Sequence, residues 1–345
     1  MTCSRYGKQV IIDRKIILKA VNDLSTKEEI LNLLRKNSDF ASGEELSECL
    51  GVSRTAVWKA INALRDEGYT VQSATNRGYK LAASPDAVTR QEIESGLKTD
   101  VLAKNIQCHN SIDSTNDEAK RQAMNGAPNG SLFIAEQQSG GKGRLGRAFL
   151  SPPGTGLWFS VLLRASLIPE HITNITLQAG LAVCKAIRKL TGCPAEIKWP
   201  NDVVIGGRKV CGILTEMAAE IDRVNYIVVG IGINVNIPSF PEELSGKATS
   251  LLLETGENVP RIRLLQEVLF QFEKLLTNRA DDFLDKYKAL CVSLNRKVGF
   301  SRNNIPLTGT AADISPDGEL LVRLEDGSVV PVSSGEVTVQ GIYGQ

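Results

Sequence analysis

The nine residues 139–147 combine the residue types that bind an anion, and they follow an apolar run at 132–135 that is typical of a strand. Glycine allows backbone N–H groups to approach a ligand closely, and Lys and Arg side chains add charge-assisted hydrogen bonds. We therefore expect this loop to wrap a phosphate or a carboxylate. Its glycines and cations are Gly140, Gly141, Gly143, Gly146, Lys142, Arg144 and Arg147.

Two common nucleotide-binding motifs do not fit this loop. The spacing of Gly141, Gly143 and Gly146 imitates the dinucleotide fingerprint, but that motif requires a helix directly after it. The segment 148–156 contains two prolines and two glycines, which prevent a helix of useful length. A P-loop requires Ser or Thr after the Gly-Lys pair, and Gly143 stands there.

Other candidate binding residues lie at the ends of predicted elements. Thr115 and Glu118 have capping-box spacing before a helix at 119–124, which leaves Ser114 and Asn116 as further polar groups at a helix N-terminus, where a ligand could bind. Lys198 ends a short strand of a predicted hairpin over 195–214, and it is either a solvated cation or a buried charge held for an anion. The apolar strand 226–233 contains two glycines, which often mark close contact with a ligand or a neighbouring backbone.

Length and composition indicate a globular chain of two or three domains. The 345 residues are 42% hydrophobic and 23% charged, and no apolar run approaches the roughly 20 residues of a membrane helix. Seven cysteines without a C-x-x-C pair, and only two histidines, His109 and His171, predict neither a metal site nor a disulfide framework and suit a reducing cytoplasm. Residues 1–24 lack a signal-peptide pattern and are expected to be either a disordered tail or the product of a misassigned start.

Residues 25–83 have the pattern of a winged helix-turn-helix. Apolar residues at helical spacing near Ile30 predict a first helix, 44–50 a second, and a third begins after Ser53, with Gly51 in the tight turn. Two short strands, 69–72 and 78–81, then predict a hairpin that would form the wing. The alternative is a small protein-interaction domain with a solvated basic face.

The third helix of this segment supplies polar side chains suited to DNA. Val57, Ile61 and Leu64 would face inward, so the opposite face is free for phosphates and base edges. A single copy reads only a half-site, so a specific repressor of this kind would act as a dimer. The candidate DNA-binding residues are Ser53, Arg54, Thr55, Lys59, Asn62 and, at the wing tip, Arg77.

Five segments in this order resemble the biotin protein ligases, in the bifunctional form that also carries a winged-helix repressor domain. The resemblance implies an α+β chain with a winged helix-turn-helix at 25–83, a mixed α/β ligase domain of the biotin/lipoate ligase type at 84–295, and a C-terminal SH3-like small β-barrel at 296–345. The segments are 113–116, 138–147, 198–202, 209–214 and 230–234.

The resemblance also implies a reaction. Biotin would be adenylated by ATP with Mg²⁺, and biotinyl-5'-AMP would then pass biotin to a lysine of a biotin carboxyl carrier protein. Lys198 and Arg144 would be catalytic, whereas Arg147, Phe149 and Asn234 would join Arg144 in holding ATP or the adenylate. The residues that would bind biotin are Ser114, Thr115, Asn116, Gln138, Lys142, Gly143, Arg144 and Lys198.

Operator DNA and a homodimer of the adenylate-bound protein complete the implied set of partners, with no membrane among them. Two positions depart from the family pattern, since Lys142 stands where Arg is common and Phe149 where Trp is common. Two alternatives remain: a biotin-sensing regulator without ligase activity, which would have no reason to keep Arg144 and Lys198, and a lipoate or octanoate ligase, which would not need a polar pocket.

Overall fold

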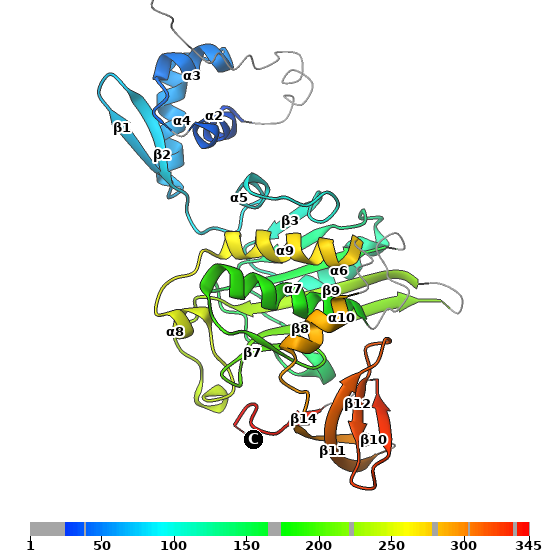
Figure 1. Cartoon of the computed structure of the whole chain (residues 1–345). Coiled ribbons are helices and arrows are strands. Elements are labelled where there is room, and N and C mark those ends of the chain that lie inside the picture. The colour runs from blue at the N-terminus through cyan, green and yellow to red at the C-terminus, as the bar shows by residue number, and fades with distance from the viewer. Residues whose placement is uncertain are drawn as a thin grey trace, which may run out of the picture. The chain divides into compact units, whose positions relative to one another are not determined.

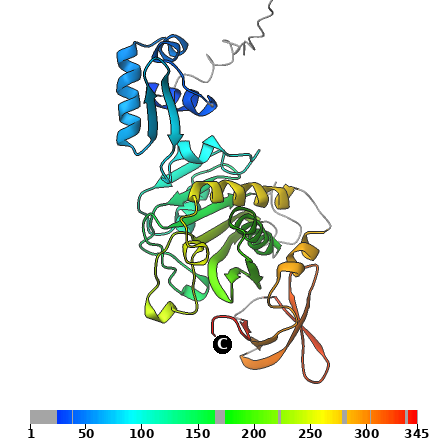
Figure 2. The same cartoon turned by 60° about the vertical axis from the view of Figure 1, so that its left-hand side comes forward.

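The computed structural model describes residues 25–37, 39–164, 174–220, 224–277, 282–302, 304–333 and 337–344. The predicted tail at 1–24 lies outside these residues. The described residues form two compact units divided after Pro85, close to the predicted boundary between 25–83 and 84–295. Figures 1 and 2 show the elements of both units from two directions.

The first unit is a winged helix-turn-helix, as predicted. Each of its three helices begins at a serine whose side chain accepts a hydrogen bond from the backbone of the first turn. Gly51, at φ 65°, ends the second helix in the left-handed conformation that glycine adopts most easily. The elements are α2 (Thr26–Lys36), α3 (Gly43–Leu50), α4 (Arg54–Asp66) and the antiparallel pair β1 (Thr70–Ala74) and β2 (Gly78–Ala83).

A seven-stranded sheet forms the centre of the second unit. Its strand order is β3-β4-β5-β9-β8-β7-β6, and only the pair β3 and β4 is parallel. The strands are β3 (Ile106–His109), β4 (Leu132–Ala135), β5 (Gly156–Leu163), β6 (Glu196–Lys198), β7 (Asp202–Ile205), β8 (Arg208–Ala219) and β9 (Val224–Asn234).

Helices cover both faces of this sheet (Figure 1). Side chains alternate between the faces of a strand. Phe133, Leu162 and Val228 therefore pack with α6 (Thr115–Met124), whereas their neighbours in sequence pack in the main core with α7 (Asn174–Thr191) and α9 (Arg261–Thr277). The remaining helices are α5 (Arg90–Ser95), α8 (Leu251–Thr255) and α10 (Phe283–Leu290), with short 3-10 turns at Arg144–Gly146 and Glu242–Leu244.

The hairpin predicted over 195–214 is a three-stranded meander instead. The chain turns once at 199–201, between β6 and β7, and again at Gly206 and Gly207, whose φ values are 56° and 76°. Two successive residues with positive φ form the tight turns that suit antiparallel hairpins. The first turn follows the short strand that the sequence predicts to end at Lys198, whereas the second turn was missed because 203–214 was taken as a single strand.

A small antiparallel sheet of order β13-β12-β11-β10-β14 ends the chain. Its inward residues belong to the same apolar cluster as those of the larger sheet, so the second unit has one continuous main core. Five short strands are compatible with the predicted SH3-like barrel. Among the described residues, no helix is both long and apolar enough to cross a bilayer. The strands are β10 (Lys297–Arg302), β11 (Ile305–Ile314), β12 (Leu320–Arg323), β13 (Val329–Val332) and β14 (Thr338–Val339).

Arg261, the first residue of α9, ties the start of the second unit to the sheet. Its buried guanidinium group donates to Asp86 Oδ2 at 2.9 Å and to Glu136 Oε2 at 2.7 Å. Burial acts to raise the pKa of Glu136, but hydrogen bonds from Arg261 and from the Val88 N–H outweigh burial, so the pKa is lowered. The ion pair therefore stabilises the fold at neutral pH, and this contribution is lost as the pH falls through the lowered pKa.

We expect Arg261→Leu to lower the free energy of unfolding of the second unit by about 3 kcal/mol, because a partly buried carboxylate loses its partner. Urea unfolding at pH 7 measures the change, and the deficit should shrink in acid. Arg263→Leu, an exposed position on the same helix, is the control and should change stability little. Equal stability of both variants would contradict this role.

Candidate functional site

Three glycines hollow out the sheet on the face that α6 covers. The antiparallel register aligns Ser160, Gly230 and Leu214 in one row across β5, β9 and β8, and Trp158, Gly232 and Gly212 in the next row. A Cβ at Gly230 would overlap the Asn116 side chain, and one at Gly232 would lie 2.6 Å from the ring of Phe149. The sequence predicted contact of these strand glycines with a ligand or a neighbouring backbone, and in the structure the contacts come from the side chains of Asn116 and Phe149.

The N-terminus of α6 lies over this hollow, capped by Ser114 rather than by Thr115. Ser114 Oγ accepts a hydrogen bond from the Asp117 N–H, so the predicted capping box of Thr115 with Glu118 is wrong by one residue. Thr115 instead begins the helix and is free of capping. Its N–H and hydroxyl both donate to Gln138 Oε1, at 2.8 and 3.1 Å. Ser114, Thr115 and Asn116 are all buried.

A chain of hydrogen bonds fixes the orientation of the predicted biotin-binding amides. Gln138 accepts from Thr115, so its Nε2 is turned to Ser151 Oγ, to which it donates at 2.9 Å. Asn116 donates through Nδ2 to Glu216 Oε2 at 2.8 Å, which leaves its Oδ1 2.6 Å from the hydroxyl of Ser160. Ser160 also lies 2.8 Å from Thr115 Oγ1, so this one residue of strand β5 contacts both Thr115 and Asn116.

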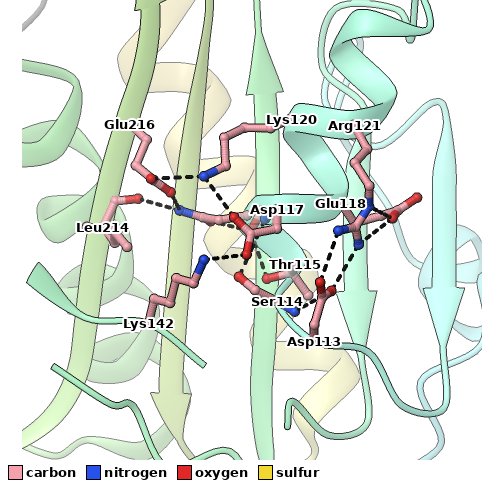
Figure 3. Close-up of polar contacts among 12 residues, drawn as sticks. Asp113, Ser114, Thr115, Asp117, Glu118, Lys120, Arg121, Lys142, Leu214 and Glu216 are labelled. Carbon is pink, nitrogen blue, oxygen red and sulfur yellow. Dashed lines mark hydrogen bonds and ion pairs between the residues drawn. The ribbon is translucent and has the colours of Figure 1, made fainter. Parts of the chain in front are cut away.

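Ion pairs tie the glycine-rich loop to α6 (Figure 3). Lys142 Nζ lies 2.5 Å from Asp117 Oδ2, and Lys120 bridges Asp117 to Glu216 at 2.8 and 3.0 Å. Burial acts to raise the pKa of Asp117, but hydrogen bonds from Lys120 and Lys142 outweigh it and the pKa is lowered. Lys142, the loop cation predicted to bind a ligand, is therefore paired with the Asp117 carboxylate of α6 in this structure.

The first turn of α6 is braced by a second charged group. Arg121 donates to both carboxylate oxygens of Asp113 and to Glu118 (Figure 3), and the hydrogen bond from Arg121 holds the pKa of Asp113 well below its usual range. These carboxylates also suit the positive end of the helix dipole. The polar residues at 114–116 are thus held on a rigid support.

A larger cavity of about 390 Å³ adjoins the hollow. Gly143, Arg144 and Phe149 line both spaces, and Arg147 lines the larger one. Arg144 Nη1 donates to Asn201 Oδ1 at 3.1 Å, which fixes the loop against the turn after β6. The Phe149 ring meets Trp158 edge-on, with centroids 5.9 Å apart. The loop therefore separates a small polar hollow from a roomier cationic cavity.

Lys209 joins the two spaces and was not among the predicted site residues. It lines both, and its Nζ forms a 2.6 Å ion pair with Asp202 Oδ1. Lys198 is buried, and its Nζ donates a hydrogen bond to the Val337 carbonyl. It belongs to the described residues that line the larger cavity and not to those that line the hollow. Lys198 is thus a buried charge rather than a solvated one. The motif 209–214 carried the signal for Lys209.

Asn234 lies behind the cavities rather than in them. Its Nδ2 donates to the carbonyls of Lys209, at 3.4 Å, and Thr249, at 3.1 Å, and it is absent from the described residues that line either space. Its buried amide therefore braces the backbone of Lys209. Any role in holding an adenylate would be indirect.

Four of the six predicted DNA-binding residues lie on α4 in the first unit, and the other two are its N-cap, Ser53, and Arg77 in the turn between β1 and β2. Thr55 and Lys59 are exposed, and Asn62 is half-buried with its Oδ1 accepting from Arg65. Ser53 caps the helix, while Arg54 and Arg77 form ion pairs with Glu44 and Asp39. Sequence reasoning missed Trp58, which is 55% exposed on α4. Its spacing from Thr55 and Asn62 was the available signal.

Three family models match the chain in order. The HTH domain model covers residues 26–80, the Biotin/lipoate A/B protein ligase family model covers 109–234, and the Biotin protein ligase C terminal domain model covers 293–339. The bifunctional ligase/repressor BirA of Bacillus subtilis is 40% identical over 296 residues, which are 84% of this chain and 91% of that protein. The chain belongs to the bifunctional biotin ligase/repressor family.

Other members of the biotin ligase/repressor family and a solved ligase agree with this assignment. The Escherichia coli bifunctional ligase/repressor BirA is 30% identical over 89% of this chain and 95% of its own length. The biotin protein ligase from Aquifex aeolicus, solved with biotin and ATP, matches with a TM-score of 0.60 and 32% identity over 69% of this chain and 99% of that chain. The predicted fold class and enzyme class are thereby confirmed.

If biotin binds in the hollow, filling the hollow with a methyl group should weaken biotin binding. Gly230→Ala should weaken biotin binding about tenfold or more, because the added methyl group must displace Asn116. Titration calorimetry with biotin measures the change. In the control Gly180→Ala, the new methyl group would meet Ile197 and Ile213 at 3.7 Å, an ordinary contact on the opposite face. Unchanged affinity in folded Gly230→Ala would show that biotin binds elsewhere.

Proposed function

We propose that this chain adenylates biotin with ATP and transfers biotin from biotinyl-5'-AMP to a lysine of a biotin carboxyl carrier protein, while its N-terminal unit represses biotin genes. The observation that supports the proposal most directly is that the hollow and the larger cavity meet at the glycine-rich loop. A polar hollow is lined by Ser114, Thr115, Asn116 and Gln138, and a cationic cavity lies beside it. A ligand with a polar ring and a carboxylate tail would extend from one into the other.

The polar hollow suits the ureido ring of biotin, which has two N–H donors and one carbonyl acceptor. The hydroxyls of Ser114 and Thr115 can donate and accept, and the Asn116 and Gln138 amides are held in fixed orientations by Glu216 and Ser151. A lipoyl or octanoyl chain offers no such groups and would gain no hydrogen bonds from these residues. This contrast favours biotin over a plain acyl chain.

The cationic cavity suits the chemistry of the first step. The biotin carboxylate attacks the α-phosphorus of ATP and pyrophosphate leaves, so two anions must meet. Lys142, Gly143, Arg144 and Lys209 lie where the carboxylate would arrive, while Arg147 and Lys198 face the phosphate side. Cations placed in advance offset the repulsion and stabilise the charge that develops in the transition state. Phe149, which lines both spaces, would stack on adenine, and Asn234 supports the backbone of Lys209.

The second step requires no nucleophile from this chain. The uncharged amine of the carrier lysine attacks the acyl carbon of biotinyl-AMP and the C–N bond forms. The bond from the acyl carbon to the phosphate oxygen breaks, AMP leaves with its electron pair, and the nitrogen releases one proton to water. The protein's contribution is to keep the mixed anhydride in place and away from water until the carrier arrives. The glycine-rich loop would serve that role, and its lining of both spaces supports this proposal.

Mg²⁺ is implied by the use of ATP, but the described residues do not form a metal site of their own. No group of three or more His, Cys, Asp or Glu among them could hold an ion. Of the described residues that line the larger cavity, Asp202 alone is acidic, and it is paired with Lys209. The oxygen donors that Mg²⁺ prefers would thus have to come from ATP phosphates and water.

The ligase proposal is tested with a biotin carboxyl carrier domain, ATP, Mg²⁺ and biotin or lipoate. Mass spectrometry should show one biotin added to one lysine and no lipoyl product. Arg144→Ala and Lys209→Ala should slow biotin transfer on the order of 10²-fold because a charge at the reacting carboxylate is lost. Lys104→Ala, an exposed distant position, is the control. Tight biotin binding without any modification would instead indicate a ligand-sensing regulator.

We propose that the adenylate-bound protein forms a homodimer and that this dimer binds the operator, so that biotin adenylation in the second unit controls DNA binding by the first. The supporting observation is a single winged helix, which reads one half-site and needs a second copy to recognise an operator. ATP, DNA and the carrier protein meet in the cytoplasm, and we propose that the protein works there. Biotin plus ATP should therefore shift the protein toward dimers in sedimentation and raise its affinity for DNA.

Trp58 allows the DNA proposal to be tested directly. It is 55% exposed, whereas Trp158 and Trp199 are 0% and 1% exposed, so a change in indole emission on adding a duplex selected from a random pool reports on α4. Lys59→Ala should weaken binding and reduce the salt slope by about one ion. The control Lys104→Ala should match the wild type. If Lys59→Ala binds DNA with the same affinity and the same salt slope as the wild type, the face of α4 that carries Lys59 is not the DNA-binding surface.

A further inference from the structure

The segment after β14 folds back onto the ligase sheet and places Tyr343 in the larger cavity. The Tyr343 N–H donates to the carbonyl of Gly207, in the turn between β7 and β8, at 2.9 Å. Ile342 is 2% exposed, and Arg296 donates to the carbonyl of Gln340 at 3.1 Å. Figure 1 follows this segment from β14 toward the end marked C. Backbone and side-chain contacts therefore both fix the position of Tyr343.

The Tyr343 side chain contacts the acidic and basic residues of the larger cavity. Its hydroxyl donates to Asp202 Oδ2 at 2.6 Å, while Asp202 Oδ1 pairs with Lys209 Nζ at 2.6 Å. Lys198 Nζ lies 5.2 Å from the centroid of the Tyr343 ring, within the range of a cation–π contact. The two lysines proposed to act on biotin and ATP thus meet at one carboxylate and one phenol.

This arrangement keeps a buried carboxylate charged. Asp202 is 7% exposed, and burial acts to raise its pKa, but the charges of Lys209 and Lys198 and hydrogen bonds from Lys209 and Tyr343 outweigh burial, so the pKa is lowered. Burial, and then the neighbouring Asp202, raise the pKa of Tyr343, which keeps the phenol protonated as a donor. The titratable groups facing Asp202 are Lys198, Lys209, Tyr343, Cys211 and Tyr287.

We propose that Tyr343 is a positioning residue for biotin adenylation: its hydroxyl holds Asp202 in the orientation that directs Lys209 toward the junction of the hollow and the cavity. The inference rests on the proposed ligase function. Without the second donor, Asp202 would have Lys209 as its main partner and could rotate with it, so Lys209 would no longer be held for an incoming carboxylate. The C-terminal segment would thereby be part of the adenylation site rather than only a support for the small sheet.

Tyr343→Phe isolates the hydroxyl, because the ring and its packing remain. Single-turnover formation of biotinyl-AMP from biotin and MgATP should slow about tenfold, the loss expected for a hydrogen bond to a charged group. The KM for biotin should change less than about threefold, because the residues proposed to bind the ureido ring, Ser114, Thr115, Asn116 and Gln138, are untouched. The acid limb of the rate profile should move to higher pH, since loss of a donor raises the pKa of the carboxylate.

Tyr226→Phe, a half-buried position at the far end of β9, is the matched control and should leave rate and pH profile unchanged. NMR titration of the Asp202 carboxyl supplies a readout that does not depend on activity, and its pKa should rise in Tyr343→Phe alone. An unchanged titration, or a lower stability with an unchanged pH profile, overturns the proposal. A wild-type protein that makes no biotinyl-AMP would instead refute the proposed function, whatever the titration of Asp202 shows.

Discussion

The absence of a side chain at three neighbouring sheet positions determines where the rest of the site can lie. Gly212, Gly230 and Gly232 leave room on the α6 face of the sheet, and that room is used by Asn116 and Phe149. The N-terminus of α6 can therefore pack directly on the strands through Asn116. Phe149, which follows the glycine-rich loop, can pack beside it. A residue with a Cβ at position 230 or 232 would push both apart, because packed interiors do not deform freely.

Electrostatics then divides the space between two kinds of ligand chemistry. The hollow is lined by neutral polar residues held by hydrogen bonds, from Ser160 through Thr115 and Gln138 to Ser151, together with the cations Lys142, Arg144 and Lys209. On the other side of the loop are the cations that line the larger cavity, with Asp202 fixing Lys209 among them. A molecule with a neutral polar ring and an acid group matches both sides, and a phosphate donor matches the second. The fold thus places a recognition site beside a site for charge neutralisation.

The sequence predicted the fold well where its signals are local. Serine caps, Gly51 and the apolar spacing of α4 define the winged helix, and the strand glycines and the 139–147 loop were identified as places of close approach. It failed where a role depends on distant partners. Glu216 holds Asn116 from 100 residues away, and Tyr343 reaches Asp202 across 141 residues. The resemblance named Lys198 and not Lys209, and only the folded sheet shows that Lys209 borders both spaces.

A crystal structure of the chain soaked with biotin and a non-hydrolysable ATP analogue tests the central claim most directly. The account predicts the bicyclic ring over Gly230 and Gly232, with its ureido group hydrogen-bonded to residues of 114–116, and the carboxylate facing Lys209 and Arg144. Phosphates should lie in the larger cavity. A biotin ring outside the glycine hollow, or a carboxylate pointing away from Lys209, would contradict it.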